Sequence, residues 1–114
     1  MKQYTTPNQT AKLIELGFDK PKGWNAKNIS SRFVMAADVD GDNKFNYSIG
    51  ELIEMLPRVI EGEYRNSLLA IESDNTKWWV MYLYMGKQEY ASKSAELIDA
   101  LFEMIIKLKE EGVI

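Results

Sequence analysis

The run from Lys77 to Met85, Lys-Trp-Trp-Val-Met-Tyr-Leu-Tyr-Met, constrains the fold of this chain more than any other segment. Aromatic and β-branched residues favour strands, and successive side chains of a strand point to opposite faces. Both faces of this strand are apolar, with Trp78, Val80, Tyr82 and Tyr84 on one and Trp79, Met81, Leu83 and Met85 on the other. Because a strand that is buried on both faces usually lies inside its sheet, we expect 77–85 to be the central strand.

Strands are also predicted on either side of this run. Residues 64–72 favour a strand, which ends at the turn sequence Ser-Asp-Asn-Thr of 73–76. After a second turn at Gly86-Lys87, a shorter strand is expected around residues 89–92. Since consecutive strands tend to pair, the sequence predicts a three-stranded antiparallel meander centred on residues 78–85.

Two capping boxes mark the beginnings of helices. In the first, Thr6 caps the helix and Gln9 reaches back to the amide of the cap residue. In the second, Ser48 and Glu51 play the same two parts, and an amphipathic stripe follows them. The second helix must be short, because Pro57 disfavours helical geometry at the residue before it.

A third helix is predicted at the end of the chain, starting after Ser94 and running to about Glu111. Gly112 follows it where a left-handed cap belongs, and Gly17 has the same place after the first helix. The polar residues of the last helix share one face, and apolar residues cover about half of its circumference. Such a helix is amphipathic with an unusually wide apolar face.

Together these elements predict a single α+β domain over residues 1–114 with the order α-β-β-α-β-β-β-α. We expect an antiparallel sheet of about four to five strands and a short central helix. The N- and C-terminal helices are expected to pack on the sheet. Residues 24–46 are ambiguous, because their alternation permits a strand without demanding one; we place a hairpin there that crosses at 40–43.

The chain contains neither His nor Cys. This excludes disulfides, thiolate chemistry, Cys/His zinc sites and His-based catalytic triads. A carboxylate pair such as Glu51 with Glu54, or Asp38 with Asp40, would need a separation of a few ångströms that closeness in sequence does not establish. We therefore expect no enzymatic activity.

The charge balance bears on possible partners. A net charge of −3 and a pI near 5.0 disfavour binding of nucleic acid through its phosphates. Strand aromatics could still stack on bases or sugars, although aromatic residues also simply fill sheets well; the set is Trp78, Tyr82, Tyr84, Tyr64 and Tyr90. The N-terminus carries no signal-peptide pattern, and the longest apolar run is far shorter than the about 20 residues of a membrane span. We expect a cytoplasmic protein with no membrane contact.

An acidic run in the first half of the chain is the candidate metal site. Asp38, Asp40 and Asp42 place carboxylates at alternate positions, as calcium loops do. Such loops also need Gly at position 6 and Glu at position 12. Counted from Asp38, position 12 is Ile49; counted from Asp40, it is Glu51, but position 6 is not Gly. Two interpretations therefore stay open: a weak Ca²⁺ site, and a solvated turn followed by a helix cap.

Three stretches carry a resemblance: Thr5 to Phe18, Tyr47 to Pro57, and Ser94 to Ile114. Together they resemble small proteins of gut Bacteroidales and of their phages and integrated elements, a group with no established activity. The similarity covers roughly half of the chain, by the span of these stretches against one domain. It implies a bacterial or phage accessory protein of the cytoplasm, with no cofactor and no catalytic residues. We expect such a protein to act through contacts with a protein partner.

The wide apolar face of the last helix also predicts self-association. If one side of the helix faces the sheet, Phe102 and Ile106 lie on the far edge of its apolar arc. Leaving large apolar side chains in water forgoes about 1.5–3 kcal/mol each. A twofold homodimer would bury them in both chains. The alternative is that residues 24–32 fold over them, and the sequence does not decide between the two.

Overall fold

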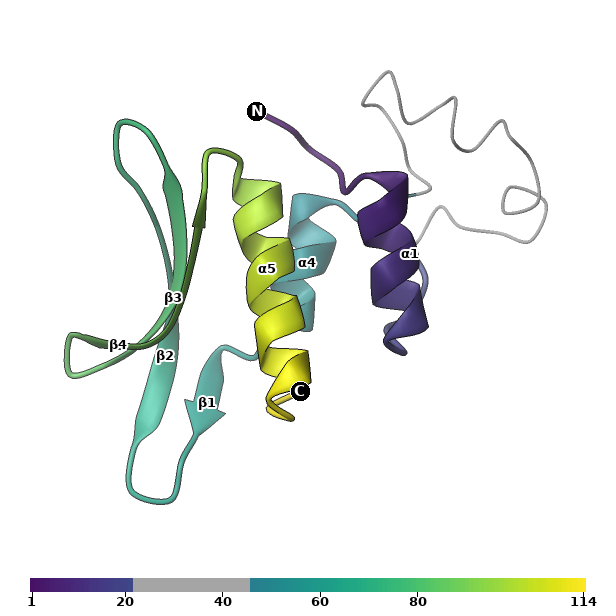
Figure 1. Ribbon diagram of the computed structural model, residues 1–114. Helices are drawn as coiled ribbons and strands as arrows, with labels where there is room; N and C mark the ends of the chain where they lie inside the picture. Colours follow the sequence, from purple (N-terminus) through teal and green to yellow (C-terminus); the bar gives the residue numbers. More distant parts are fainter. Residues whose placement is uncertain (22–45) are drawn as a thin grey trace.

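The computed structural model describes residues 1–21 and 46–114. Within these ranges the chain forms three helices and a four-stranded antiparallel sheet, which confirms the α+β class (Figure 1). The helices are α1 (Pro7–Glu15), α4 (Ile49–Met55) and α5 (Leu97–Glu110); the strands are β1 (Val59–Glu61), β2 (Asn66–Ser73), β3 (Trp78–Tyr84) and β4 (Lys87–Ser94). The predicted hairpin that crosses at 40–43 lies outside the described residues.

The strands lie in the order β1-β2-β3-β4, so the predicted meander is confirmed and β3 lies between two partners. The carboxylate of Asp74 shapes the β2–β3 turn by accepting hydrogen bonds from the backbone N–H groups of Thr76 and Lys77, both at 2.7 Å. Met85 and Gly86 both have positive φ in the β3–β4 turn, as tight hairpins of this kind require. Strand β1 was not predicted, because three residues are too few to show an alternating pattern.

Both predicted capping boxes are present. Thr6 Oγ1 accepts from the Gln9 amide at 3.1 Å, and Gln9 Oε1 accepts from the Thr6 amide at 3.0 Å. Ser48 and Glu51 make the corresponding bonds at 3.2 and 3.3 Å. The predicted stops are also confirmed, since Gly17 and Gly112 have φ of 97° and 75°. Helix α5 begins later than expected, with Glu96 as an N-cap that makes no side-chain cap bond.

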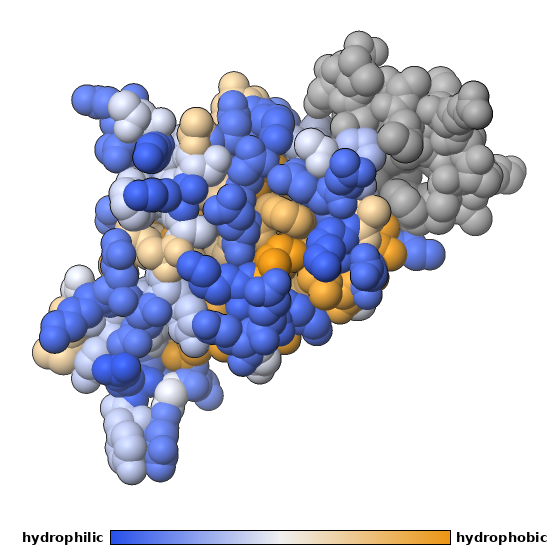
Figure 2. Space-filling model, in the orientation of Figure 1, coloured by the Kyte–Doolittle hydropathy of each residue, from blue (hydrophilic) through white to orange (hydrophobic). Residues whose placement is uncertain are grey.

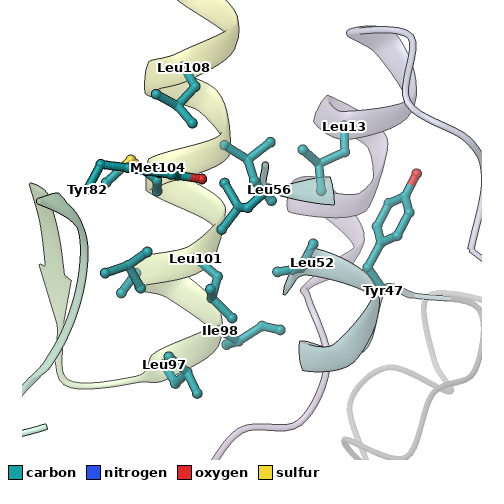
Figure 3. Packing of buried hydrophobic residues seen from close by; sticks show 13 residues of the cluster. Leu13, Tyr47, Leu52, Leu56, Tyr82, Leu97, Ile98, Leu101, Met104 and Leu108 are labelled. Carbon is teal, nitrogen blue, oxygen red and sulfur yellow. The ribbon is translucent and has the colours of Figure 1, made fainter. Parts of the chain in front are cut away.

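The helices form layers on one face of the sheet. Helix α5 packs directly on that face, and α4 and α1 lie on the other side of α5 (Figure 1). The core fills the space around α5: Figure 3 shows Leu101, Met104 and Leu108 of α5 between Tyr82 of the sheet and a group that comprises Leu13, Leu52 and Leu56. Only α5 of the two terminal helices therefore contacts the sheet extensively.

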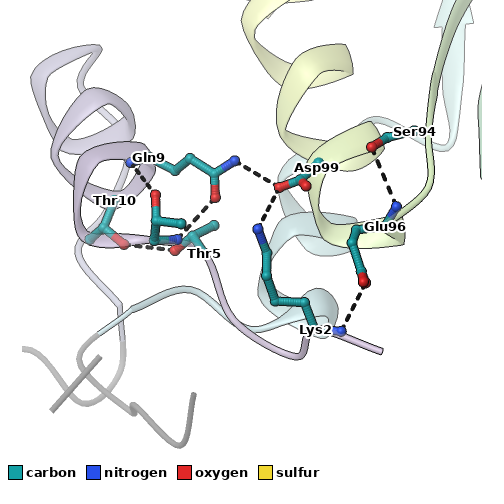
Figure 4. Close-up of polar contacts among 8 residues, drawn as sticks. Lys2, Thr5, Gln9, Thr10, Ser94, Glu96 and Asp99 are labelled. Atoms are coloured by element: carbon teal, nitrogen blue, oxygen red, sulfur yellow. Dashed lines mark hydrogen bonds and ion pairs between the residues drawn. The ribbon is translucent and has the colours of Figure 1, made fainter. Parts of the chain in front are cut away.

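Polar contacts fasten the N-terminal segment to α5 (Figure 4). Lys2 Nζ pairs with Asp99 Oδ1 at 2.9 Å, and the Lys2 amide donates to Glu96 Oε2 at 2.9 Å. The side-chain amide of Gln9 also donates to Asp99 at 2.9 Å. Helix α1, which begins at Pro7, is thus held beside the first turn of α5 by hydrogen bonds in addition to apolar packing.

Candidate interaction surface

The two faces of the sheet have different surroundings. Val80 and Tyr82 point toward α5 and are fully buried in the core. The opposite face, which we call the open face, carries no helix from residues 1–21 or 46–114 (Figure 1). Cross-strand register places these residues on it: Val59, Leu68, Ala70, Glu72, Trp79, Met81, Leu83, Gln88, Ala91 and Lys93. Every residue of β3 is buried or partly buried, and Met81 on this face is only 4% exposed, although no helix of the described residues lies over it.

Trp79 is the largest side chain of the open face, and two charged groups fix its indole ring. Its Nε1 donates to Asp74 Oδ2 at 3.2 Å, and Lys93 Nζ lies 5.1 Å from the centre of the ring. Hydrogen bonds from the amides of Thr76 and Lys77, and then from Trp79, hold the pKa of the Asp74 carboxyl well below its ordinary value. Asp74 is therefore an anion at neutral pH. The indole is held in place and remains partly accessible.

Met81 lies at the centre of the open face between two small residues. Ala70 is its partner on β2 and Ala91 its partner on β4. Only 4% of Met81 is exposed, and its Sδ accepts a hydrogen bond from Gln88 Nε2 at 3.0 Å. A shallow hollow of about 200 Å³ lies beside it, lined by Glu72, Ser73, Asp74, Trp79, Met81 and Gln88. Its neighbours on the sheet and the amide of Gln88 therefore cover Met81, with no helix above it.

The other end of the open face is aliphatic and accessible. Leu68 pairs with Leu83 on one side and with Val59 on the other. The exposed fractions of Leu68 and Val59 are 57% and 38%, although both side chains are fully apolar. Scattered apolar residues on a surface are ordinary, but a contiguous apolar patch with a polar rim indicates a contact site. The open face is such a patch, because Glu72, Gln88 and Lys93 border it.

The edges of the sheet offer less to a partner than this face does. On the β4 edge, Lys107 Nζ donates to the carbonyl oxygen of Ala91 at 2.6 Å. This α5 side chain occupies a carbonyl of the edge strand, and covering an edge in this way opposes pairing with another strand. A bulge at Glu89, which pairs with Arg65 at 2.9 Å, further interrupts that strand. Strand β1 at the other edge is only three residues long.

The candidate metal residues Asp38, Asp40 and Asp42 lie outside the described residues. Of the nearby residues, Glu51 closes the capping box of α4 and Asn46 is buried, with its side-chain oxygen accepting from the Thr10 hydroxyl. Within residues 1–21 and 46–114 there is no group of three or more acidic side chains that could hold a metal ion.

The aromatic residues proposed as a stacking platform face the core for the most part. Tyr82 is fully buried, and its hydroxyl donates to the carbonyl oxygen of Pro57 at 2.6 Å. Tyr90 packs edge-to-face against it, with ring centroids 6.3 Å apart, and Trp78 packs against the same core. Packing accounts for these three residues. Of the other two in the proposed set, Tyr84 is partly buried with the Arg65 guanidinium 5.3 Å from its ring centre, and Tyr64 is 89% exposed in the turn before β2. Trp79, which was not in the set, is partly accessible on the open face.

Phe102 and Ile106 are half-buried and pack against the core. Helical spacing places them on the side of α5 that carries Asp99 and Lys109. At one end of that side Gln9 of α1 bonds Asp99, and at the other Lys109 Nζ lies 5.5 Å from the centre of the ring of Phe18, which follows α1. Apolar surface is visible between α5 and α1 in Figure 2. A homodimer through this side of α5 stays a prediction. Its support is weaker than full exposure of Phe102 and Ile106 would give, because both side chains are half-buried. The alternative cover, residues 24–32, lies outside the described residues.

No helix among the described residues has the length and apolar content needed to cross a membrane. Comparison with known proteins found no matching family model, no matching curated protein and no matching solved structure. Sequence reasoning did not identify the open face, because apolar residues on both faces of the central strand do not show which face a helix covers. The available signal was the charge at its rim, since Glu72 and Lys93 sit in strands on either side of Trp79.

Proposed function

We propose that this chain is a non-enzymatic accessory protein of the cytoplasm that acts through protein–protein contacts made by the open face. The observation that carries the proposal is the accessible apolar surface of that face, above all Leu68, which is 57% exposed. The bacterial or phage origin rests on the sequence resemblance alone.

The composition of the open face supports a contact surface for protein. Interfaces are enriched in aromatic residues and Met at their centre and have a polar rim. Here Trp79 lies on the central strand β3, and the rim carries Glu72, Gln88 and Lys93. Truncation of a Trp that is fixed before binding is often among the most costly changes in an interface. The contacts of Trp79 with Asp74 and Lys93 fix its ring in this way.

Photo-crosslinking in bacteria that carry the gene tests the proposal. A photoreactive amino acid at Leu68 should give adducts with protein, because that side chain would lie inside the contact. The same group at Glu103, which is exposed on α5, is the matched control and should give none. Absence of protein adducts at Leu68 would overturn the proposal, and equal adducts at both positions would mean that contacts are not specific to the open face.

A further inference from the structure

Building on the proposed function, we infer that the partner of the open face is a second copy of this chain, packed sheet against sheet about a twofold axis that runs parallel to β3. The arrangement of charge and side-chain size on the face supports this choice of partner.

The charges of the open face are distributed antisymmetrically about β3. Glu72 on β2 and Lys93 on β4 are both register partners of Trp79, so the three form one row across the sheet. Glu72 and Lys93 are exposed. A rotation of 180° about an axis along β3 exchanges the β2 side with the β4 side. Each Glu72 then faces Lys93 of the other copy, and two ion pairs form.

The same rotation places Leu68 opposite Gln88 of the other copy and leaves the other uncharged pairs apolar. Residues of β3 lie near the axis, so Trp79 and Leu83 each meet their own counterpart, whereas Met81 is only 4% exposed and lies beneath Gln88. Ala70 lies opposite Ala91 of the other copy, which lets the two sheets approach on both sides of Met81. Packed sheets need about 10 Å between them, with side chains interdigitating. Small residues beside large ones allow that interdigitation.

A second face-to-face orientation is excluded by the same rows. An axis in the plane of the face but perpendicular to the strands would place the row of Glu72 and Lys93 against the row of Leu68 and Leu83. Glu72 would then face Leu68 and lose water without gaining a charged partner, which is costly, while Lys93 would face Gln88. Addition at the β4 edge is opposed by Lys107. The axis parallel to β3 remains.

The size of the face sets the strength of the expected dimer. Strands of eight residues at 3.4 Å per residue, with neighbours about 4.8 Å apart, give a face of roughly 27 by 14–19 Å. That is below the about 800 Å² per partner of a standard stable interface. We therefore expect a weak, reversible dimer and not a permanent one.

Charge reversal in two separate variants tests the inference. By analytical ultracentrifugation, Glu72→Lys alone and Lys93→Glu alone should each weaken the dimer at least tenfold, because each homodimer would contain like charges face to face. An equimolar mixture of the two should dimerise again, since opposite charges then face each other at both places in the heterodimer, one pair as in the wild type and the other reversed. Wild-type protein that stays monomeric up to about 500 μM, or a mixture that stays as monomeric as its components, overturns the inference.

Cysteine crosslinking provides a second measurement that does not rely on charge. Because the chain has no Cys, a single Leu83→Cys near the axis should link two copies through a short bismaleimide, whereas the control Glu103→Cys should not. Equal linking at both positions contradicts the axis. Phe102→Glu should leave the dimer intact; loss of the dimer in that variant would place the interface on α5 instead.

These outcomes separate the inference from the proposed function. A photo-adduct formed at Leu68 whose mass is twice that of the chain supports both the proposed function and the second copy as the partner. Adducts of another mass, with a monomeric purified protein, keep the proposed function and overturn the second copy. Absence of any adduct at Leu68 overturns both.

Discussion

Two matched leucine-to-alanine substitutions test whether the sheet has one covered and one open face. Leu101 of α5 is fully buried between the sheet and α4, whereas Leu68 of β2 is 57% exposed on the open face. The substitution removes the same atoms at both positions. Only their surroundings differ, so the difference in the free energy of unfolding reports burial directly.

The expected costs differ by a factor of about three or more. Leu101→Ala loses the transfer free energy of the side chain and leaves a cavity, so it should destabilise the protein by about 3 kcal/mol, within the 2.7–5.0 kcal/mol measured for buried leucines elsewhere. Full burial of a leucine side chain contributes about 1.5–3 kcal/mol, and Leu68 is less than half buried. Leu68→Ala also opens no cavity, so it should lower the free energy of unfolding by about 1 kcal/mol or less.

Urea denaturation followed by tryptophan fluorescence measures both costs at about 1 μM protein, where the dimer is dissociated. The slope of unfolding free energy against urea should stay the same in both variants, because the surface exposed on unfolding hardly changes. A cost for Leu68→Ala equal to that of Leu101→Ala would refute the reasoning, since it would mean that the open face is covered within the monomer.

Three further perturbations test other parts of the chain. Burial, with the nearby carboxylates of Glu51 and Asp19, raises the pKa of Tyr47 to about 12. The neutral Tyr47 hydroxyl therefore contributes its full stability below pH 10, and this contribution is lost as the pH rises toward 12. Between pH 8 and 11, the unfolding free energy of the wild type should fall by about 1.4 kcal/mol more than that of Tyr47→Phe in denaturant titrations. A Cβ on Gly62 would lie 2.6 Å from the carbonyl oxygen of Arg65, so Gly62→Ala should lower the melting temperature by several degrees; an unchanged value contradicts the turn geometry. If the acidic run binds Ca²⁺, calcium at 100 times its dissociation constant should add about 2.7 kcal/mol to stability, and Asp38→Asn with Asp40→Asn should abolish the effect; no shift in millimolar calcium ends that alternative.

Local signals in the sequence were sufficient for most of the secondary structure. The cap of α1 needs Thr6 and Gln9 and nothing distant, and the stop at Gly112 depends on the freedom of glycine at positive φ. The meander followed in the same way from short turns between apolar runs. These elements could be predicted because the interactions that define them span only a few residues.

The layers could not be predicted in this way. Alternation along β3 shows that both of its faces are apolar, but it does not say whether a helix covers each one. One face of β3 meets α5, and the other is shielded only by its neighbours, as when Gln88 covers Met81. The contact between Gln9 and Asp99 joins residues 90 positions apart. Such pairings depend on the whole fold, and no local pattern in the sequence encodes them.

Hydroxyl-radical footprinting of the purified protein, as its concentration rises from about 1 to 500 μM, tests the central claim most directly. Labelling of Leu68 and Trp79 should fall severalfold as copies associate through the open face. Tyr64 and Met85, which are 89% and 84% exposed in the turns, should keep their labelling. Labelling of Leu68 and Trp79 that is independent of concentration would contradict the claim that the open face binds a second copy.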